Sequence, residues 1–502
     1  MLGEFAVEPP AYAQPILFET IESGLAHPAG RGRGEIADDL YALGVTVLSL
    51  LLGSLPTNEA SGETILQRKI QESSYAFLVG KRALSLRAME LLKGLLMDAR
   101  ERRWTLDRVE RWLDEYHDPN LPNVADHAPH VFTFRQEPHV TGRSLAYAFT
   151  QHPQDAARAI RETRFESWVV RSIVNPEMAR YLMEEVVASR SSTISAEQLV
   201  ARVAILLDPK APIRYRNFSA TIDGLGTMLA VGFADDEIRH NFTEVIRLNL
   251  AQLWVTAQGP IVANRKLLQR LYRLQHFIGR RGLGFGLERC LYELVPGARC
   301  LSTLVLPRYC TGVSELLSTL EAATGQLQRM VEPMDNHITA FIATHFPGKV
   351  DTFLASLVSP RGSAERVFGV LGLLASLQDR YGPAKVPGLA GWMLRMLPPV
   401  ISSYHNQATR KQLEESVEQI AVRGSLVELY NLVGNPARRR ADHRAYAMAR
   451  GEFMRMVAET AKIEQQLQGL SLSALVMGRL LAARFSMLIA LIALGVLLSQ
   501  RI

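Results

Sequence analysis

Residues 37–56, ADDLYALGVTVLSLLLGSLP, are apolar on nearly every side once two opening carboxylates are passed. We predict a helix here that is capped by Asp38 or Asp39, because a carboxylate accepts hydrogen bonds from free backbone N–H groups. Gly53 and Pro56 are predicted to end it. A helix that is apolar all round either forms the centre of a domain or crosses a membrane. The apolar part would rise only about 20 Å against roughly 30 Å of bilayer hydrocarbon, so we predict a buried core helix.

Two pairs of motifs give the N-terminal region a family resemblance. DLYALGV at 39–45, followed by LLGSLP at 51–56, resembles the D-[IVL]-[YW]-[SA]-x-G-V and LL-x-G-x-x-P signature of the central C-lobe helix of Ser/Thr protein kinases. LLKGLLMD at 91–98 and RWTL at 103–106 resemble that fold's LL-x-x-LL-x-x-D-P-x-x-R-x-T segment. The resemblance covers residues 15–118.

The resemblance implies structural roles for a few side chains. These residues are Glu19, Glu22, Asp39, Gly44 and Arg103. In the family, the glutamate of an A-P-E motif pairs with a buried arginine, so we expect Glu19 or Glu22 to pair with Arg103. The chain has no A-P-E, and the spacing to Asp39 is longer than in the family.

The motifs of phosphoryl transfer are missing from the sequence. A kinase needs a Gly-rich cover over the phosphates, a strand Lys, the Asp of H-R-D-x-x-x-x-N and the metal-binding Asp of D-F-G. In the family all of them precede the segment that Asp39 opens, and the residues before Asp39 contain none. We therefore expect no catalytic, cofactor-binding or metal-binding residue here, with ATP and Mg²⁺ only if an N-terminal portion is missing. The chain is then either a fragment of a kinase or a degenerate module retained for binding.

Composition limits the remaining functions. The chain has 502 residues and a formal net charge of +6, which indicates mild attraction to anionic surfaces and no nucleic-acid partner. Cys290, Cys300 and Cys310 are odd in number and include no C-x-x-C pair, so we predict three reduced thiols. No basic and then apolar segment opens the sequence, so we expect no signal peptide.

Two glycine-rich segments are candidates for phosphate loops. Residues 27–34, HPAGRGRG, lack the Lys that often accompanies such a loop, and we predict a flexible insertion before the central helix. Residues 279–288, GRRGLGFGLE, follow a helical pattern and not a strand, so we predict that their glycines end one helix and start the next. A phosphate loop is the alternative for both.

The chain divides into four predicted parts. Residues 1–118 form the partial kinase-like C-lobe, and 119–143 form a Pro/His-rich linker that holds a short strand at 131–134. In residues 144–470 the apolar positions recur with a helical period, apart from an irregular stretch at 208–225. The sequence is consistent with one domain or two in this region. Residues 480–500 form a C-terminal transmembrane helix.

The C-terminal region carries a periodic stripe, a basic run and an apolar tail. The stripe, close to a heptad, predicts pairing with another helix and consists of Phe453, Val457, Thr460, Ile463, Leu467 and Leu470. The basic face that could lie against anionic head groups consists of Arg438, Arg439, Arg440 and Arg444. The tail, LLAARFSMLIALIALGVLLS, is long enough to span a bilayer, and Arg484 can snorkel from near one end. A buried C-terminal helix is the alternative.

The fold class we predict is mainly α, with a partial kinase-like C-lobe, a large α-helical domain and a C-terminal hydrophobic helix. The resemblance and the apolar tail together predict a membrane-anchored, kinase-like signalling protein, and the resemblance with the Ala/Arg/Leu-rich composition indicates a bacterial type. Because the motifs of phosphoryl transfer are missing, we expect it to be catalytically inactive as this chain and to act through protein partners. Its single span would leave the bulk of the chain cytoplasmic. The alternative function is a helical scaffold or adaptor whose kinase likeness is ancestral only.

Overall fold

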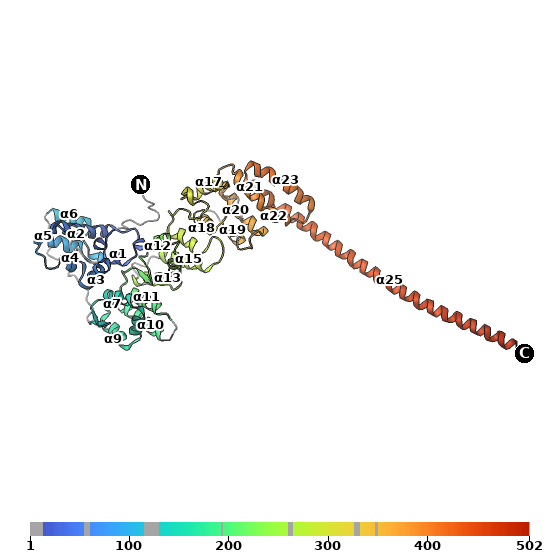
Figure 1. The fold of residues 1–502 in the computed structure, drawn as a ribbon, viewed down its shortest axis with the longest axis horizontal. Helices are drawn as coiled ribbons and strands as arrows, with labels where there is room; N and C mark the ends of the chain where they lie inside the picture. The colour runs from blue at the N-terminus through green and yellow to red at the C-terminus, as the bar shows by residue number, and fades with distance from the viewer. Residues whose placement is uncertain are drawn as a thin grey trace. The chain divides into compact units, whose positions relative to one another are not determined.

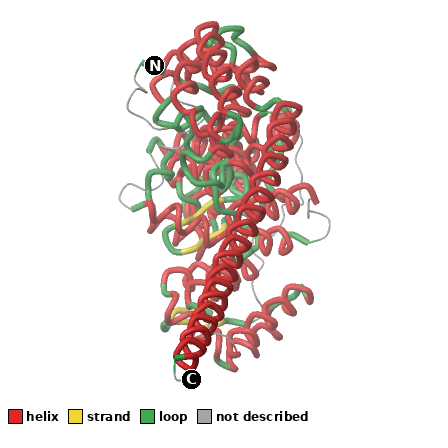
Figure 2. Tube along the Cα trace, turned by 90° about the vertical axis from the view of Figure 1, so that its right-hand side faces the viewer, coloured by secondary structure: helices red, strands yellow, loops and turns green. Residues whose placement is uncertain are grey.

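The computed structural model describes residues 14–54, 61–114, 130–191, 194–259, 265–325, 332–346 and 350–500. The fold is mainly α-helical, as predicted, and the strands among these residues form two short antiparallel hairpins (Figure 2). The chain divides into two compact units, Met1–Val358 and Ser359–Ile502. This boundary falls inside the helical region predicted at 144–470.

The first helices of unit 1 are organised around α2, Ile36–Leu52. They are α1 (Ile21–Leu25), α3 (Gly62–Glu72), α4 (Ser74–Val79), α5 (Leu86–Leu95) and α6 (Leu106–Leu113). One face of α2 buries Tyr41, Val45 and Leu48 in the core, which confirms a core helix. Leu43 and Leu50 on the other side are 42% and 78% exposed, so the predicted burial on every side is wrong.

The ends of α2 are set by one carboxylate and one glycine. The Asp38 carboxylate accepts a hydrogen bond from the Glu35 N–H at 3.0 Å, so Asp38 satisfies a donor of the first turn from inside the helix. Asp39 is exposed and does not cap it. Gly53 ends the helix in the left-handed conformation, with a φ of 70°, as predicted. Pro56 lies outside the described residues.

In the rest of unit 1, α11, Ala196–Leu207, is buried along most of its length and packs against the helices at 142–161, 176–191 and 250–257. The other helices of this unit are α7 (Gly142–Gln151), α8 (Pro153–Arg161), α9 (Thr163–Ser172), α10 (Pro176–Ser191), α12 (Leu225–Val231), α13 (Asp236–Arg247), α14 (Leu250–Ala257), α15 (Arg265–Gly279), α16 (Gly286–Leu294), α17 (Val313–Ala323), α18 (Asn336–His345) and α19 (Asp351–Ser356). Figure 1 shows them following one another along the chain from α7 to α19.

The two hairpins lie where the sequence predicted a linker and an irregular stretch. The first pairs β1 (Phe132–Phe134) with β2 (Glu137–His139), which confirms the strand expected at 131–134. Its Phe132 ring contacts the rings of Phe149, Phe165 and Trp168, so this part of the predicted linker belongs to the core of unit 1. Residues 119–129 of that linker lie outside the described residues. The second pairs β3 (Ile213–Tyr215) with β4 (Phe218–Ala220), which corrects the irregular assignment of 208–225.

Unit 2 is a helical bundle from which one long helix extends. Its helices are α20 (Ala364–Tyr381), α21 (Pro387–Met396), α22 (Pro398–Ser402), α23 (Gln407–Arg423), α24 (Leu426–Val433) and α25 (Pro436–Ser499). The central helix, α20, packs against α22 and α24 and is buried along most of its length. The last helix, α25, contains 64 residues in one uninterrupted run (Figure 1). It joins the predicted heptad stripe and the apolar tail in a single element.

Candidate functional site

The glutamates expected to pair with Arg103 have other partners. Glu19 forms an ion pair with Arg31 at 2.7 Å, and both side chains are 6% exposed. Arg103 donates hydrogen bonds to the carbonyl oxygens of Met97 and Ala37 at 2.9 and 2.8 Å. The predicted pairing is therefore wrong. Burial lowers the pKa of Arg103, while the charge of Glu22 opposes this effect without forming an ion pair with it.

Gly44 is required by packing. A Cβ at this position would lie 2.9 Å from the Leu95 Cβ and 3.0 Å from Leu96. The absence of a side chain at Gly44 therefore allows the backbone of α2 to pack closely against α5. Trp104 needs a second glycine, because a Cβ at Gly94 would lie 2.3 Å from its indole ring. These glycines are structural and give the region a close-packed core.

Lys69 is a fully buried cation that the sequence did not single out. Its Nζ donates to the carbonyl oxygens of Ile16, Leu17 and Glu19 at 2.8 to 2.9 Å. An ammonium has three donors, and here each has an acceptor. Burial lowers the pKa of Lys69 to about 7, and the carboxylates of Asp98 and Glu19 oppose this shift. Because α3 is a mainly polar helix, its sequence pattern does not indicate that the Lys69 side chain is buried.

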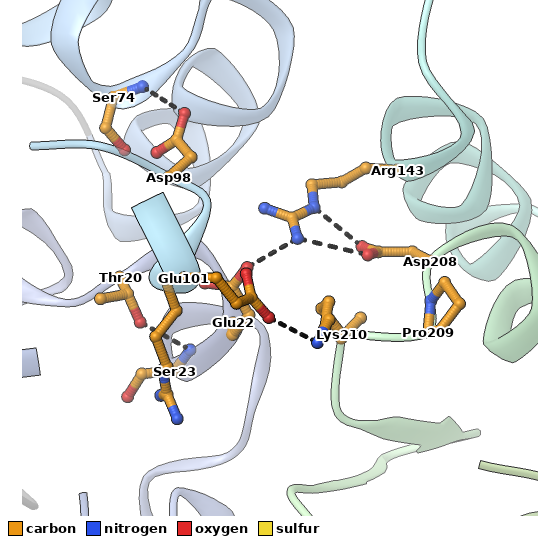
Figure 3. A network of polar contacts seen from close by, with 12 residues as sticks. Thr20, Glu22, Ser23, Ser74, Asp98, Glu101, Arg143, Asp208, Pro209 and Lys210 are labelled. Carbon is orange, nitrogen blue, oxygen red and sulfur yellow. Dashed lines mark hydrogen bonds and ion pairs between the residues drawn. The ribbon is translucent and has the colours of Figure 1, made fainter. Parts of the chain in front are cut away.

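An ion network joins the first helices to the helical region after residue 130 (Figure 3). The Arg143 guanidinium contacts Glu22 at 2.6 Å and Asp208 at 3.0 Å. Burial alone would lower the pKa of Arg143, but the carboxylates of Asp208 and Glu22 raise it above its ordinary value. At the surface, Lys210 pairs with Glu101 at 2.6 Å. The network holds two parts of one unit together.

The loop at 27–34 is held against β4 by its backbone. Its Gly30 carbonyl accepts from the Thr221 N–H at 2.8 Å, and the Gly30 N–H donates to the His27 carbonyl at 2.7 Å. A Cβ at Gly30 would lie 2.4 Å from the Ser219 carbonyl oxygen, so the loop lies directly against β4. The prediction of a flexible insertion is wrong. The second glycine-rich segment joins α15 to α16, as predicted.

Among the described residues, no group of three or more His, Cys, Asp or Glu side chains is placed to hold a metal ion. Cys290, Cys300 and Cys310 are free and buried. Burial raises the pKa of Cys300 to about 12 and that of Cys310 to about 11, so these thiols stay protonated at neutral pH. They are packing residues and not activated nucleophiles.

The first turns of α25 are attached to the bundle of unit 2. Asp442 accepts hydrogen bonds from the backbone N–H groups of His405 and Asn406, both at 2.9 Å. The His405 ring stacks on Tyr446, with their centroids 3.9 Å apart. Every residue from 447 to 499 whose exposure is described is exposed. The long helix is therefore held at one end only.

The C-terminal part of α25 has the properties of a membrane span. In the part of the chain that the structure describes, one helix is long and apolar enough to cross a membrane, and it ends at Ser499. None of its most apolar window is buried. The alternative of a buried C-terminal helix is therefore wrong.

The predicted basic face is divided between two environments. Arg439 lies over the rings of Phe368 and Tyr404 and donates to the Val433 carbonyl, so it belongs to the bundle. Arg440 and Arg444 are exposed one turn apart. Arg438 is partly buried beside them.

The same arginines lie far from the apolar tail. Arg444 and Leu480 are 36 positions apart in one helix, which corresponds to about 54 Å at 1.5 Å per residue. Charges at that distance are screened, because the Debye length is about 8 Å at physiological ionic strength. A helix that stands across the bilayer cannot also lay Arg440 and Arg444 on its head groups, so this geometry opposes the predicted contact. Arg479 and Arg484 lie at the start of the apolar tail.

Comparison of the chain with protein-family models, with curated proteins and with solved structures gave no match. The most distinctive exposed feature of this chain is α25.

Proposed function

We propose that this protein is a membrane-anchored helical protein that acts through protein contacts. In this proposal residues 14–114 are a non-catalytic, kinase-like binding module, and α25 carries the anchor. The single observation that carries the proposal is the exposed end of α25, where the apolar residues 485–498 include no charge. Exposed apolar surface of this extent costs free energy in water and is removed by entering lipid.

The orientation follows from the basic residues at the start of the tail. Arg479 and Arg484 precede the apolar run, and a basic flank favours the cytoplasmic side. The compact parts of both units lie N-terminal to these arginines in sequence, so we place them in the cytoplasm with a single span after them.

The kinase-like part of the proposal is supported by its signature residues and their packing. Gly44 sits where α2 meets α5, and Trp104 packs on Gly94, as a compact lobe requires. The carboxylates of Glu19 and Glu22 are engaged in ion pairs with arginines. A role in binding partners therefore fits this part better than a role in phosphoryl transfer.

Flotation of the full chain with phosphatidylcholine vesicles tests the anchor. These lipids carry no net charge, so binding reports apolar insertion. We expect the unaltered chain to float and the double variant Ile489→Arg with Ile492→Arg to stay in the soluble fraction, since each central arginine costs about 2.5–3.5 kcal/mol of insertion. Gln465→Arg, on an exposed part of the same helix, is the matched control and should float. Equal flotation of all three proteins would contradict the anchor.

Addition of ATP and Mg²⁺ tests the non-catalytic assignment. A ligand that binds the folded chain raises its melting temperature by mass action. We expect no change in the melting temperature of the full chain. A rise of several degrees would mean that a nucleotide site exists and that the binding-module proposal is wrong.

A further inference from the structure

The exposed middle part of α25 has an apolar stripe that continues to the start of the tail. With Phe453 as position a of a heptad, the a and d positions are Phe453, Met456, Thr460, Ile463, Leu467, Leu470, Ala474, Met477 and Leu481. The large side chains Phe453, Met456 and Leu467 are 63%, 62% and 59% exposed. Four consecutive heptads of this kind are typical of a coiled coil.

The charged residues of this segment all avoid the stripe. They are Arg455, Glu459, Lys462, Glu464 and Arg479, and none occupies an a or d position. The one polar a position, Thr460, donates its hydroxyl to the Met456 carbonyl at 2.8 Å. Its side chain can therefore be buried without an unpaired donor.

We propose that α25 pairs in parallel with α25 of a second copy of this chain through residues 453–481. The parallel orientation rests on the proposed membrane anchor, because two copies that enter the bilayer from the same side have their helices parallel and at the same depth. Each a or d residue then faces the same residue of the second copy. The stripe of a second copy is therefore the partner that fits in register. Confinement to one membrane also raises the effective concentration of the second copy.

The segment just before the apolar tail permits close approach of the two helices. Ala474, Gly478 and Ala482 recur every four residues and, with Ser471 and Leu475, line a shallow hollow on the helix surface. Small residues at this spacing allow helices to pack closely at the membrane. In the register set by Phe453, Ala474 is an a residue, Gly478 an e residue beside the stripe and Ala482 a b residue away from it, so Ala474 and Gly478 are the small residues at the pairing surface.

In a parallel pair, one contact between the two helices brings charged side chains of the same sign together. Residue g of one helix faces residue e of the next heptad on the partner, which places Glu459 opposite Glu464 of the second copy. Like charges at this position weaken the pair. Glu464→Lys would replace the repulsion with attraction and increase the paired fraction, whereas Gln465→Lys at position f would not change it.

Single-cysteine cross-linking of the full chain in phosphatidylcholine vesicles tests the pairing. The native thiols are buried, and the unaltered chain gives the background. After oxidation with copper phenanthroline, Thr460→Cys and Ile463→Cys should give severalfold more covalent dimer than Ala458→Cys and Gln465→Cys, which lie at position f. Equal cross-linking at the four sites, or none above background, would overturn the proposal. A paired fraction that falls for Glu464→Lys would overturn the parallel register.

Flotation of the same samples separates this proposal from the anchor. A chain that floats but cross-links equally on all faces contradicts the pairing and leaves the anchor intact. A chain that does not float contradicts the anchor, and the cysteine scan then reports the pairing of the soluble chain.

Discussion

The Arg143 guanidinium, at the start of α7, donates a hydrogen bond to the Glu22 carboxylate in α1 at 2.6 Å, across 121 residues of sequence. On its other side it binds Asp208, whose side chain is 5% exposed. One cation therefore balances two carboxylates that would otherwise lie unpaired beside one another. This arrangement makes the contact between the first helices and the rest of unit 1 depend on charge as well as on apolar packing.

Replacing Arg143 with Met should destabilise unit 1 severely. Removing one partner of a buried ion pair costs about 3–5 kcal/mol, because the remaining charge is left unpaired. The free energy of unfolding, measured with denaturant, is the readout. Arg158→Met is the control, since that arginine is 77% exposed and its pair with Asp155 is worth at most about 1 kcal/mol. Equal losses for the two variants would show that the network does not stabilise the fold.

The stability of the chain relative to Lys69→Met should rise with pH. The folded pKa of Lys69 is about 7, below the value of about 10.4 for an unfolded lysine. Between these values the unfolded chain binds more protons, so the contribution of Lys69 to stability is greatest above pH 10 and is lost as the pH falls toward 7. Unfolding of both proteins across this window gives the difference. A difference independent of pH would mean that the three carbonyl acceptors keep the ammonium protonated in the fold.

Alanine at two helical glycines should have opposite effects. Gly94→Ala forces a Cβ into the Trp104 ring, and overpacking of this kind costs about 1–3 kcal/mol. Gly391→Ala, in α21, meets nothing within 4 Å and should gain about 0.5–1 kcal/mol from reduced backbone entropy. Thermal unfolding of both variants is the measurement. A neutral Gly94→Ala would mean that Trp104 is free to move.

Arginines at two heights on α25 should differ in their effect on membrane binding. Arg479→Ala with Arg484→Ala should weaken flotation with phosphatidylserine-containing vesicles, since a basic residue near an anionic surface contributes about 1 kcal/mol. Arg440→Ala with Arg444→Ala should leave flotation and its salt dependence unchanged. The expected contrast comes from the roughly 54 Å of helix between Arg444 and Leu480. A loss of binding in the second variant would mean that α25 bends or lies on the surface.

The sequence predicted features that depend on local chemistry. Gly53 ends α2 because the left-handed conformation favours glycine. The helices from residue 144 onward could be predicted because the period of their apolar residues is a local property of the sequence. The hairpin of β3 and β4 was missed, although Ile213, Tyr215, Phe218 and Ala220 are its buried apolar residues. Its two-residue turn, Arg216–Asn217, includes no glycine to mark it.

The ion pairs required tertiary information that no short motif contains. Glu22 and Arg143 are individually ordinary surface-type residues, and only the fold brings their side chains within 2.6 Å of each other. The expected partner, Arg103, is instead satisfied by carbonyl oxygens that a sequence pattern does not reveal. The same reason applies to Lys69, whose three acceptors lie about fifty residues earlier in the chain.

On the proposed anchoring, α25 acts as a stalk of fixed length. Between Tyr446, the last residue stacked on the bundle, and Leu480, where the predicted C-terminal tail starts, the helix rises about 50 Å. Residues 447–480 include no proline that would kink the helix. The bundle of α20–α24 is thus held well clear of the lipid head groups, and a target that lies flat on the same membrane is out of its reach. The bundle can contact molecules that diffuse freely or that extend far from the membrane. Adding or removing turns of the stalk would change which of these molecules the bundle reaches.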